Sequence, residues 1–88
     1  MYKIANVTDR EGIVKKDFID ELKLDHPNLC GYILYPELTK VGCHFCFVWN
    51  DDTDKMLRTS TIEEYYNDVD TIKVVTRNSI YYLEKEND

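Results

Sequence analysis

Most of the chain is a succession of short segments with the composition of β-strands, separated from one another by prolines or polar turns. These segments are rich in β-branched and aromatic residues, which favour extended backbone. They lie at 2–7, 30–35, 41–49, 56–62, 71–76 and 79–84. The last two predict a closing hairpin around Arg77 and Asn78, and 50–54 has the composition of a polar turn. Five or six short strands in succession favour a small antiparallel meander.

One segment has the pattern of an amphipathic helix. Thr8 and Glu11 have the spacing of a capping box, and Asp9 is a second candidate cap, so a helix is expected over about 10–24. Its apolar residues recur every four positions and form one stripe: Val14, Phe18 and Leu22. The helix is expected to stop before Pro27, since proline disfavours helical geometry at the residue that precedes it.

The length of the chain limits its stability. Its 88 residues are enough for one domain, 1–88, with a modest core. Such a domain buries only about 60% of the surface that its unfolded chain exposes, so small domains often add a disulfide or a metal. The three cysteines cannot all pair within one chain. With no apolar run that could span a bilayer and no signal peptide, we expect reduced thiols in the cytoplasm of a bacterial host.

The sharpest motif combines histidine with cysteine. Three residues separate His26 from Cys30, twelve follow, and two separate Cys43 from Cys46. Zinc prefers four thiolate or imidazole ligands in a tetrahedron, and chains commonly supply them as two close pairs. The motif predicts one structural Zn²⁺ held by His26, Cys30, Cys43 and Cys46. The predicted fold class is thus α+β: one N-terminal helix packed on a small antiparallel sheet or half-barrel of five or six strands, with a zinc site.

Other interpretations of the cysteines stay open. In a regular strand His44 and Cys46 share a face while positions 43 and 46 do not, so His44 is a reserve ligand for His26 or Cys43. The cysteines also suit burial as free thiols in a hydrophobic sheet. A redox Cys-x-x-Cys is disfavoured, because that motif normally begins a helix after a strand. The apolar residues of this segment share a face and are expected in the core: Phe45, Phe47 and Trp49.

The charge of the chain restricts its partners. It carries 17 acidic and 11 basic side chains, for a formal net charge of -6. Phosphates would be repelled, so direct binding to nucleic acid is disfavoured. A basic protein partner would instead be attracted over a long range. The chain has only three glycines and no phosphate-binding glycine loop, and Ser60 and Ser79 have no evident base, so we do not expect an enzyme.

Tyrosines and carboxylates lie together in the segment 63–70, which we expect to form an acidic connection. Tyrosine is enriched where proteins bind one another, and carboxylates would attract a basic partner. The candidate partner-binding residues are Glu63, Glu64, Tyr65, Tyr66, Asp68 and Asp70. A second tyrosine pair, Tyr81 and Tyr82, precedes Glu84. In each pair one tyrosine is expected in the core and the other on the surface.

The second half of the chain, LRTSTI followed by IKVVTRNSIYYLE, resembles the closing strands of short phage proteins with a Thr-Arg-Asn-Ser-x-Tyr pattern. As a whole, an acidic chain of fewer than 100 residues without a catalytic motif resembles the anti-CRISPR inhibitors of type II systems. That resemblance implies Cas9 as the partner and assigns no individual residue. The expected function is a zinc-containing inhibitor that binds Cas9 and blocks target DNA loading. The alternative is a phage accessory zinc-binding domain that acts as a protein-protein interaction scaffold.

Overall fold

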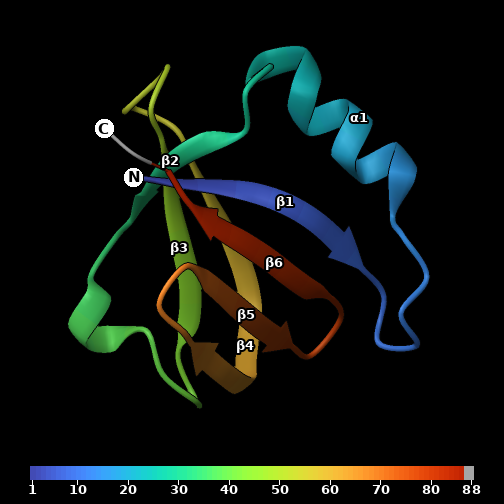
Figure 1. Ribbon diagram of the computed structural model, residues 1–88, viewed down its shortest axis with the longest axis vertical. Coiled ribbons are helices and arrows are strands. Elements are labelled where there is room, and N and C mark those ends of the chain that lie inside the picture. Colours follow the sequence, from blue (N-terminus) through green and yellow to red (C-terminus); the bar gives the residue numbers. More distant parts are fainter. Residues whose placement is uncertain (87–88) are drawn as a thin grey trace.

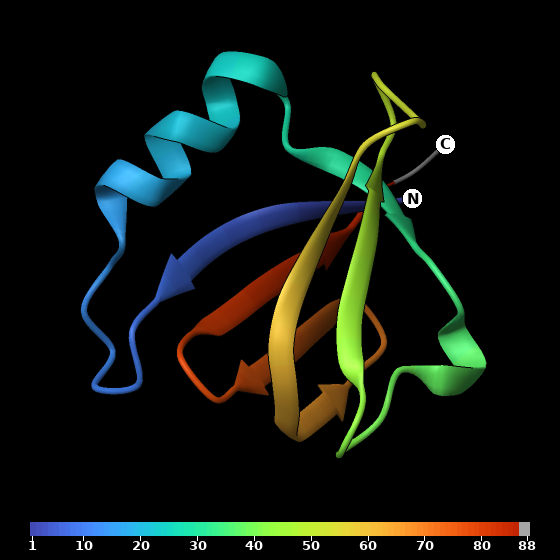
Figure 2. The same cartoon turned by 180° about the vertical axis from the view of Figure 1, so that it is seen from behind.

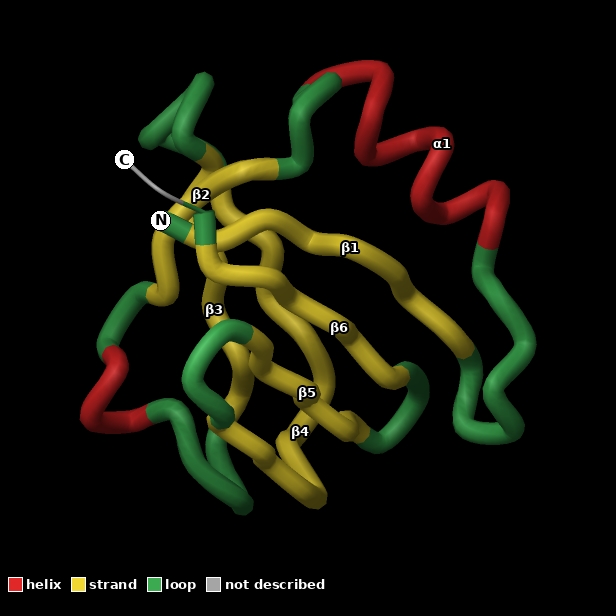
Figure 3. The backbone as a smooth tube through the Cα atoms, viewed as in Figure 1, coloured by secondary structure: helices red, strands yellow, loops and turns green. Residues whose placement is uncertain are grey.

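Six antiparallel strands close into a barrel in the computed structural model, which describes residues 1–86 (Figure 1). Each strand pairs with the next along the chain, and the last pairs back onto the first. The strands are β1 (Tyr2–Thr8), β2 (Cys30–Ile33), β3 (His44–Trp49), β4 (Met56–Asn67), β5 (Thr71–Thr76) and β6 (Ile80–Lys85). A helix, α1 (Lys16–Asp25), follows β1, and a short 3-10 helix, η1 (Pro36–Leu38), connects β2 to β3 (Figure 3).

The predicted α+β fold, with an open half-barrel and a zinc site, is wrong. The sheet closes because β1 has partners on both sides, β6 along most of its length and β2 at Tyr2 and Lys3. Closure pairs the two edges of the sheet with each other, which is how a barrel satisfies its backbone N–H and C=O groups. α1, which is described along its whole length, has no buried residue and lies against β1 outside the barrel (Figure 1). The fold is therefore mostly β.

α1 begins later than the capping box predicted, because Asp9 has a different role. Its carboxylate accepts hydrogen bonds from the backbone N–H groups of Glu11 at 2.9 Å and Ile13 at 3.0 Å. These bonds fold the residues before α1 into a loop. Val14 forms a β-bridge with Thr8 and does not join the apolar stripe of the helix. The remaining residues of that stripe, Phe18 and Leu22, pack against the core together with Ile19.

β4 includes residues that the sequence predicted to be a connection. The predicted strand ended at Ile62, whereas β4 continues to Asn67 by pairing with β5. Its register shifts between Ile62 and Glu64, and such irregularities increase the bend of a strand. Figure 2 shows the bend: the first part of β4 pairs with β3 and the second with β5. From this extended segment Tyr65 packs against the core.

The core consists of inward side chains from all six strands, and β3 supplies the largest. Phe45, Phe47 and Trp49 are buried, as predicted, and the Trp49 ring meets the Phe47 ring edge-on with centroids 5.3 Å apart. The prediction for the tyrosine pairs is also confirmed. Tyr66 is 52% exposed whereas Tyr65 is partly buried, and Tyr81 is buried whereas Tyr82 is partly exposed.

The ends of the described chain meet where β2 begins (Figure 1). The backbone N–H of Glu86 donates to the carbonyl of Met1 at 2.9 Å, and that of Asn50 donates to the carbonyl of Cys30 at 2.9 Å. This end of the barrel, the N-terminal end, therefore brings together both termini, the start of β2 and the β3–β4 turn. Neither helix within residues 1–86 has the length and apolar character needed to cross a membrane.

Candidate functional site

The four predicted zinc ligands lie in two places. His26 and Cys30 are at the start of β2, which pairs with the end of β3 near Trp49. Cys43 precedes β3 and Cys46 lies within it, and at about 3.4 Å per residue Cys43 is about 20 Å along the chain from Trp49. Within residues 1–86, no three His, Cys, Asp or Glu side chains form a group that could hold a metal ion. The four predicted ligands therefore do not form a zinc site in this structure. Zinc as a cofactor stays a prediction.

The second half of the motif lines a groove beside η1. His44 and Cys46 share the outward face of β3, as the reserve interpretation expected. The groove, which we call the η1 groove, has a volume of about 280 Å³ and is lined by Leu34, Tyr35, Leu38, Cys43, His44, Cys46 and Arg58. The Nδ1 of His44 lies 2.7 Å from the carbonyl oxygen of Thr59 and donates to it. This bond ties the His44 ring to β4.

His26 joins the end of α1 to the N-terminal end of the barrel. Its backbone N–H donates to the carbonyl of Leu22 at 2.8 Å and closes the helix, which ends before Pro27 as predicted. Its ring is buried and stacks on Trp49 with centroids 4.0 Å apart and planes 7° apart. Its Nδ1 lies 2.6 Å from a carboxylate oxygen of Asp51 in the β3–β4 turn. In this structure His26 therefore links the helix to the barrel.

The stack makes Trp49, the one tryptophan of the chain, a reporter of His26. We expect the H26Q variant, which removes the stacked ring, to change the wavelength and intensity of tryptophan emission. H44Q, which alters the other histidine, should leave the emission spectrum as it is in wild type. Steady-state fluorescence at one fixed pH checks this, and an unchanged spectrum in H26Q would contradict the stack.

A polar pocket of about 320 Å³ opens beside this stack at the N-terminal end. Cys30 lines it together with Lys3, Asp51 and Glu86. Burial, and then the negative charge of Glu86, raise the pKa of the Cys30 thiol above its ordinary value, and Lys3 offsets this only in part. A thiol with a raised pKa is protonated at neutral pH and is a poor nucleophile. The pocket therefore offers charge and hydrogen bonds and no activated thiolate.

The predicted partner-binding residues on β4 do not all face the same side of the strand. Tyr65 packs against the core, and its burial raises the pKa of its hydroxyl. Glu63 forms an ion pair with Arg10, which comes from the loop after β1. Glu64 and Tyr66 face outward, and the Tyr66 hydroxyl donates to the Glu64 carboxylate at 2.5 Å, which raises the pKa of Tyr66. The alternation of β4 explains the division.

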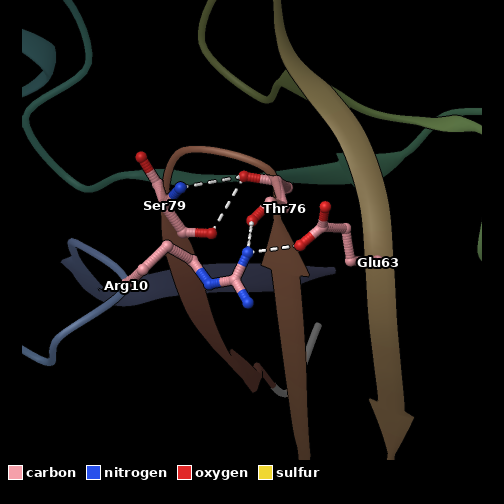
Figure 4. A network of polar contacts seen from close by, with 4 residues as sticks. All are labelled: Arg10, Glu63, Thr76 and Ser79. Atoms are coloured by element: carbon pink, nitrogen blue, oxygen red, sulfur yellow. Dashed lines mark hydrogen bonds and ion pairs between the residues drawn. The ribbon is translucent and has the colours of Figure 1, made fainter.

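Arg10 holds three parts of the chain together, as Figure 4 shows. Besides its ion pair with Glu63, its guanidinium donates to the carbonyl of Thr76 at 3.1 Å. Thr76 in turn closes the β5–β6 turn, because its hydroxyl donates to the carbonyl of Ser79 and accepts from the Ser79 N–H. Thr76 and Ser79 are the first and fourth residues of the Thr-Arg-Asn-Ser-x-Tyr pattern. Thr76 and Ser79 therefore have a structural role, and Glu63 belongs to the same network through its ion pair with Arg10.

The outward side chains of β4, β5 and β6 form a ladder of tyrosine, lysine and tyrosine. Tyr66 pairs with Lys73, and Lys73 pairs with Tyr82 in the barrel register. The Lys73 ammonium lies 5.7 Å from the centroid of the Tyr66 ring and 5.9 Å from that of Tyr82, within the range of cation–π attraction. We define the tyrosine face as Glu64, Tyr66, Lys73 and Tyr82, with Asp68 and Asp70 in the adjoining β4–β5 turn.

Lys73 was not among the predicted site residues, and Tyr82 was named only as one of a pair. The signal that identifies them is the period of two in the last two strands. Ile72 and Val74 on β5 and Tyr81 and Leu83 on β6 are buried, so Lys73 and Tyr82 must face outward. Their alignment with Tyr66 depends on the register, which no segment reveals by itself.

Comparison with known proteins gives no relative. No protein-family model, no curated protein and no solved structure matches this chain. A barrel of this kind is compatible with many functions, so a function has to be argued from the surface residues themselves.

Proposed function

We propose that this protein is an acidic binding module that inhibits a basic, nucleic-acid-handling protein in the cytoplasm of a bacterial host, with Cas9 as the leading candidate. The observation that carries the proposal is the tyrosine face. It places two tyrosine rings and one carboxylate on the outward surface of three neighbouring strands, with two more carboxylates in the adjoining turn.

The tyrosines supply the contact area. Tyrosine combines a large apolar ring with a hydroxyl and loses little conformational entropy on binding, which is why it is enriched at hot spots. Tyr66 is 52% exposed, and Tyr82 is partly exposed beside it on the same face. The Tyr66 ring is held in place by its hydrogen bond to Glu64 and by Lys73. A partner therefore meets rings that are already ordered, which lowers the entropic cost of association.

The carboxylates supply attraction and selectivity. The tyrosine face carries Glu64, Asp68 and Asp70 against the single ammonium of Lys73, and the chain as a whole has a formal net charge of -6. This field accelerates encounters with a positively charged channel and repels free nucleic acid. In Cas9 such a channel holds the guide and target strands. A bound acidic protein would therefore compete with target DNA for the same surface.

The test is a matched pair of charge reversals measured by biolayer interferometry on immobilised Cas9. E64K and E21K change the net charge equally, but Glu21 lies on α1, away from the tyrosine face. At about 50 mM salt, where screening is weak, we expect wild type and E21K to bind and E64K to associate far more slowly. Tyr66→Ala should weaken binding at least about tenfold, as expected for a hot-spot tyrosine.

Two results would contradict the proposal. One is no binding to Cas9 at low salt. The other is an equal effect of E64K and E21K together with no effect of Tyr66→Ala, which would mean that net charge and not this face determines association. Binding that does not weaken as the salt concentration rises would contradict the electrostatic part of the account.

The second candidate function is an accessory scaffold that joins other proteins. The η1 groove favours it, because exposed apolar residues line a concave surface there. A scaffold would bind its partners through this groove and not through the tyrosine face. The Tyr66→Ala variant of the same experiment therefore separates the two functions, because it should weaken only binding through the tyrosine face.

A further inference from the structure

Exposed apolar side chains gather around the η1 groove. Tyr35 and Leu38 line it and are 56% and 51% exposed. Beside it, the outward row of β2, β3 and β4 adds the exposed Tyr32 and Met56, with the partly buried Val48 between them; the three residues pair across the strands. The interior of the barrel is filled by other residues, so these side chains are not needed for the core. Contiguous exposed apolar surface of this kind usually marks a site where another molecule binds.

The backbone holds the apolar wall of the groove in an unfavourable conformation. Tyr35 has φ 54°, in the left-handed region that a bulky side chain rarely adopts. Its carbonyl accepts hydrogen bonds from the N–H of Leu38 at 2.9 Å and from the hydroxyl of Thr39 at 3.1 Å. These bonds close the single turn of η1, and the backbone N–H of Leu34, the residue before Tyr35, donates to the carbonyl of Cys46 in β3 at 2.9 Å. Strained residues that surrounding bonds hold in place are frequent at binding sites.

The charge of the groove is opposite to that of the chain. Arg58 lines it and is exposed, and within residues 1–86 its guanidinium has no carboxylate within ion-pair distance. Among residues 1–86, no Asp or Glu lines the groove. His44 also lines it. In a chain with a formal net charge of -6, this is a local site for a negative group beside an apolar surface.

We propose that the η1 groove binds a peptide segment of another protein, which places one aliphatic side chain against Leu38 and Cys46 and one carboxylate on Arg58. The pairing of an apolar wall with one unpaired guanidinium selects this occupant, because guanidinium binds carboxylate through two parallel hydrogen bonds. The proposal is independent of the tyrosine face, which selects the opposite charge. That face lies on the second part of β4 and on β5 and β6, whereas Arg58 is in the first part of β4, which pairs with β3.

The experiment titrates the full chain, ¹⁵N-labelled, with two capped dipeptides and follows amide chemical shifts by NMR. The probes are N-acetyl-leucyl-aspartyl amide and N-acetyl-leucyl-asparaginyl amide, which differ only in the charge of the second side chain. We expect the aspartyl probe to shift the amides of Leu38, Cys46 and Arg58, and to bind about tenfold more tightly than the asparaginyl probe. In the R58Q variant, the aspartyl probe should bind only as tightly as the asparaginyl probe does.

The matched control is R77Q, which makes the same substitution at another exposed arginine, in the β5–β6 turn outside the groove. R77Q should bind the aspartyl probe as wild type does. Leu38→Ser should weaken both probes, and unchanged shifts in β5 and β6 would show that each variant is folded. The proposal is overturned if the shifts map elsewhere, if R58Q and R77Q behave alike, or if neither probe binds. It is also overturned if sedimentation shows a dimer that buries this groove, because the occupant is then a second copy.

Discussion

Replacing Gly31 with alanine should lower the free energy of unfolding by about 3 kcal/mol or more, which is the upper range for an added group in a packed core. A Cβ at this position would lie 2.1 Å from the carbonyl oxygen of Val48 and 2.7 Å from the Phe47 ring. The first neighbour is backbone, so the strain cannot be relieved by a side-chain rotation. We expect β2 to separate from β3 locally and the melting temperature to fall by about 12 °C or more.

Gly12→Ala is the control for this substitution. Gly12 has φ +93° and no atom within 4 Å of an added Cβ, so alanine there meets only backbone strain. That strain should cost about 1–2 kcal/mol, less than the clash at Gly31. Thermal unfolding followed by circular dichroism compares the two variants. If Gly31→Ala unfolds at the temperature of wild type, the close packing of β2 on β3 is wrong.

Phe47→Ala should lower the free energy of unfolding by about 3–5 kcal/mol, the usual cost of removing a buried phenylalanine ring. Phe47 has an exposed fraction of 0% and lies between Phe45 and Trp49, with ring centroids 6.3 Å and 5.3 Å away. The remaining cavity would also leave Trp49 without its edge-on neighbour. In a domain of this size such a loss is a large part of the total stability.

Urea denaturation compares the free energy of unfolding of Phe47→Ala with that of two control variants, Phe47→Leu and Val69→Ala. Phe47→Leu keeps most of the volume and should cost less than the alanine variant. Val69→Ala removes an apolar side chain that is 82% exposed and should change the free energy of unfolding by less than about 0.5 kcal/mol. Equal stabilities of Phe47→Ala and Val69→Ala would contradict the assignment of the core.

The sequence predicted best the strands in which buried residues alternate with exposed ones or follow one another in a short run. β5 matches its predicted bounds of 71–76, and the hairpin around Arg77 and Asn78 is confirmed by the pairing of Val75 with Ile80. The core residues of β3 were predicted for the same reason. In these segments the side chains that decide the structure are neighbours in the sequence.

The errors have a common physical origin in long-range pairing. Residues 63–67 have the composition of a connection, yet they are extended because β5 pairs with them. The zinc motif has a plausible spacing, but antiparallel pairing of β2 with the end of β3 separates Cys30 from Cys43. The tyrosine face could be predicted in part, since Glu64 and Tyr66 were named. Lys73 could not, because its place between two rings depends on register.

The two surfaces favour partners of opposite charge. The tyrosine face carries three carboxylates and one ammonium, whereas Arg58 and His44 line the η1 groove and no carboxylate of the described residues does. A module of this kind would hold a basic protein on β4–β6 and an acidic, apolar segment beside η1. Variants of one face should leave binding at the other unchanged, because distant sites that share no contact are usually additive.

Loading of fluorescently labelled target DNA onto Cas9 with its guide, measured by anisotropy at low salt, tests the central proposal most directly. We expect wild type and E21K to lower the fraction of DNA bound, E64K to lower it much less, and added salt to remove the inhibition. Unchanged DNA loading at saturating concentrations of the wild-type protein would contradict inhibition of Cas9 by the tyrosine face.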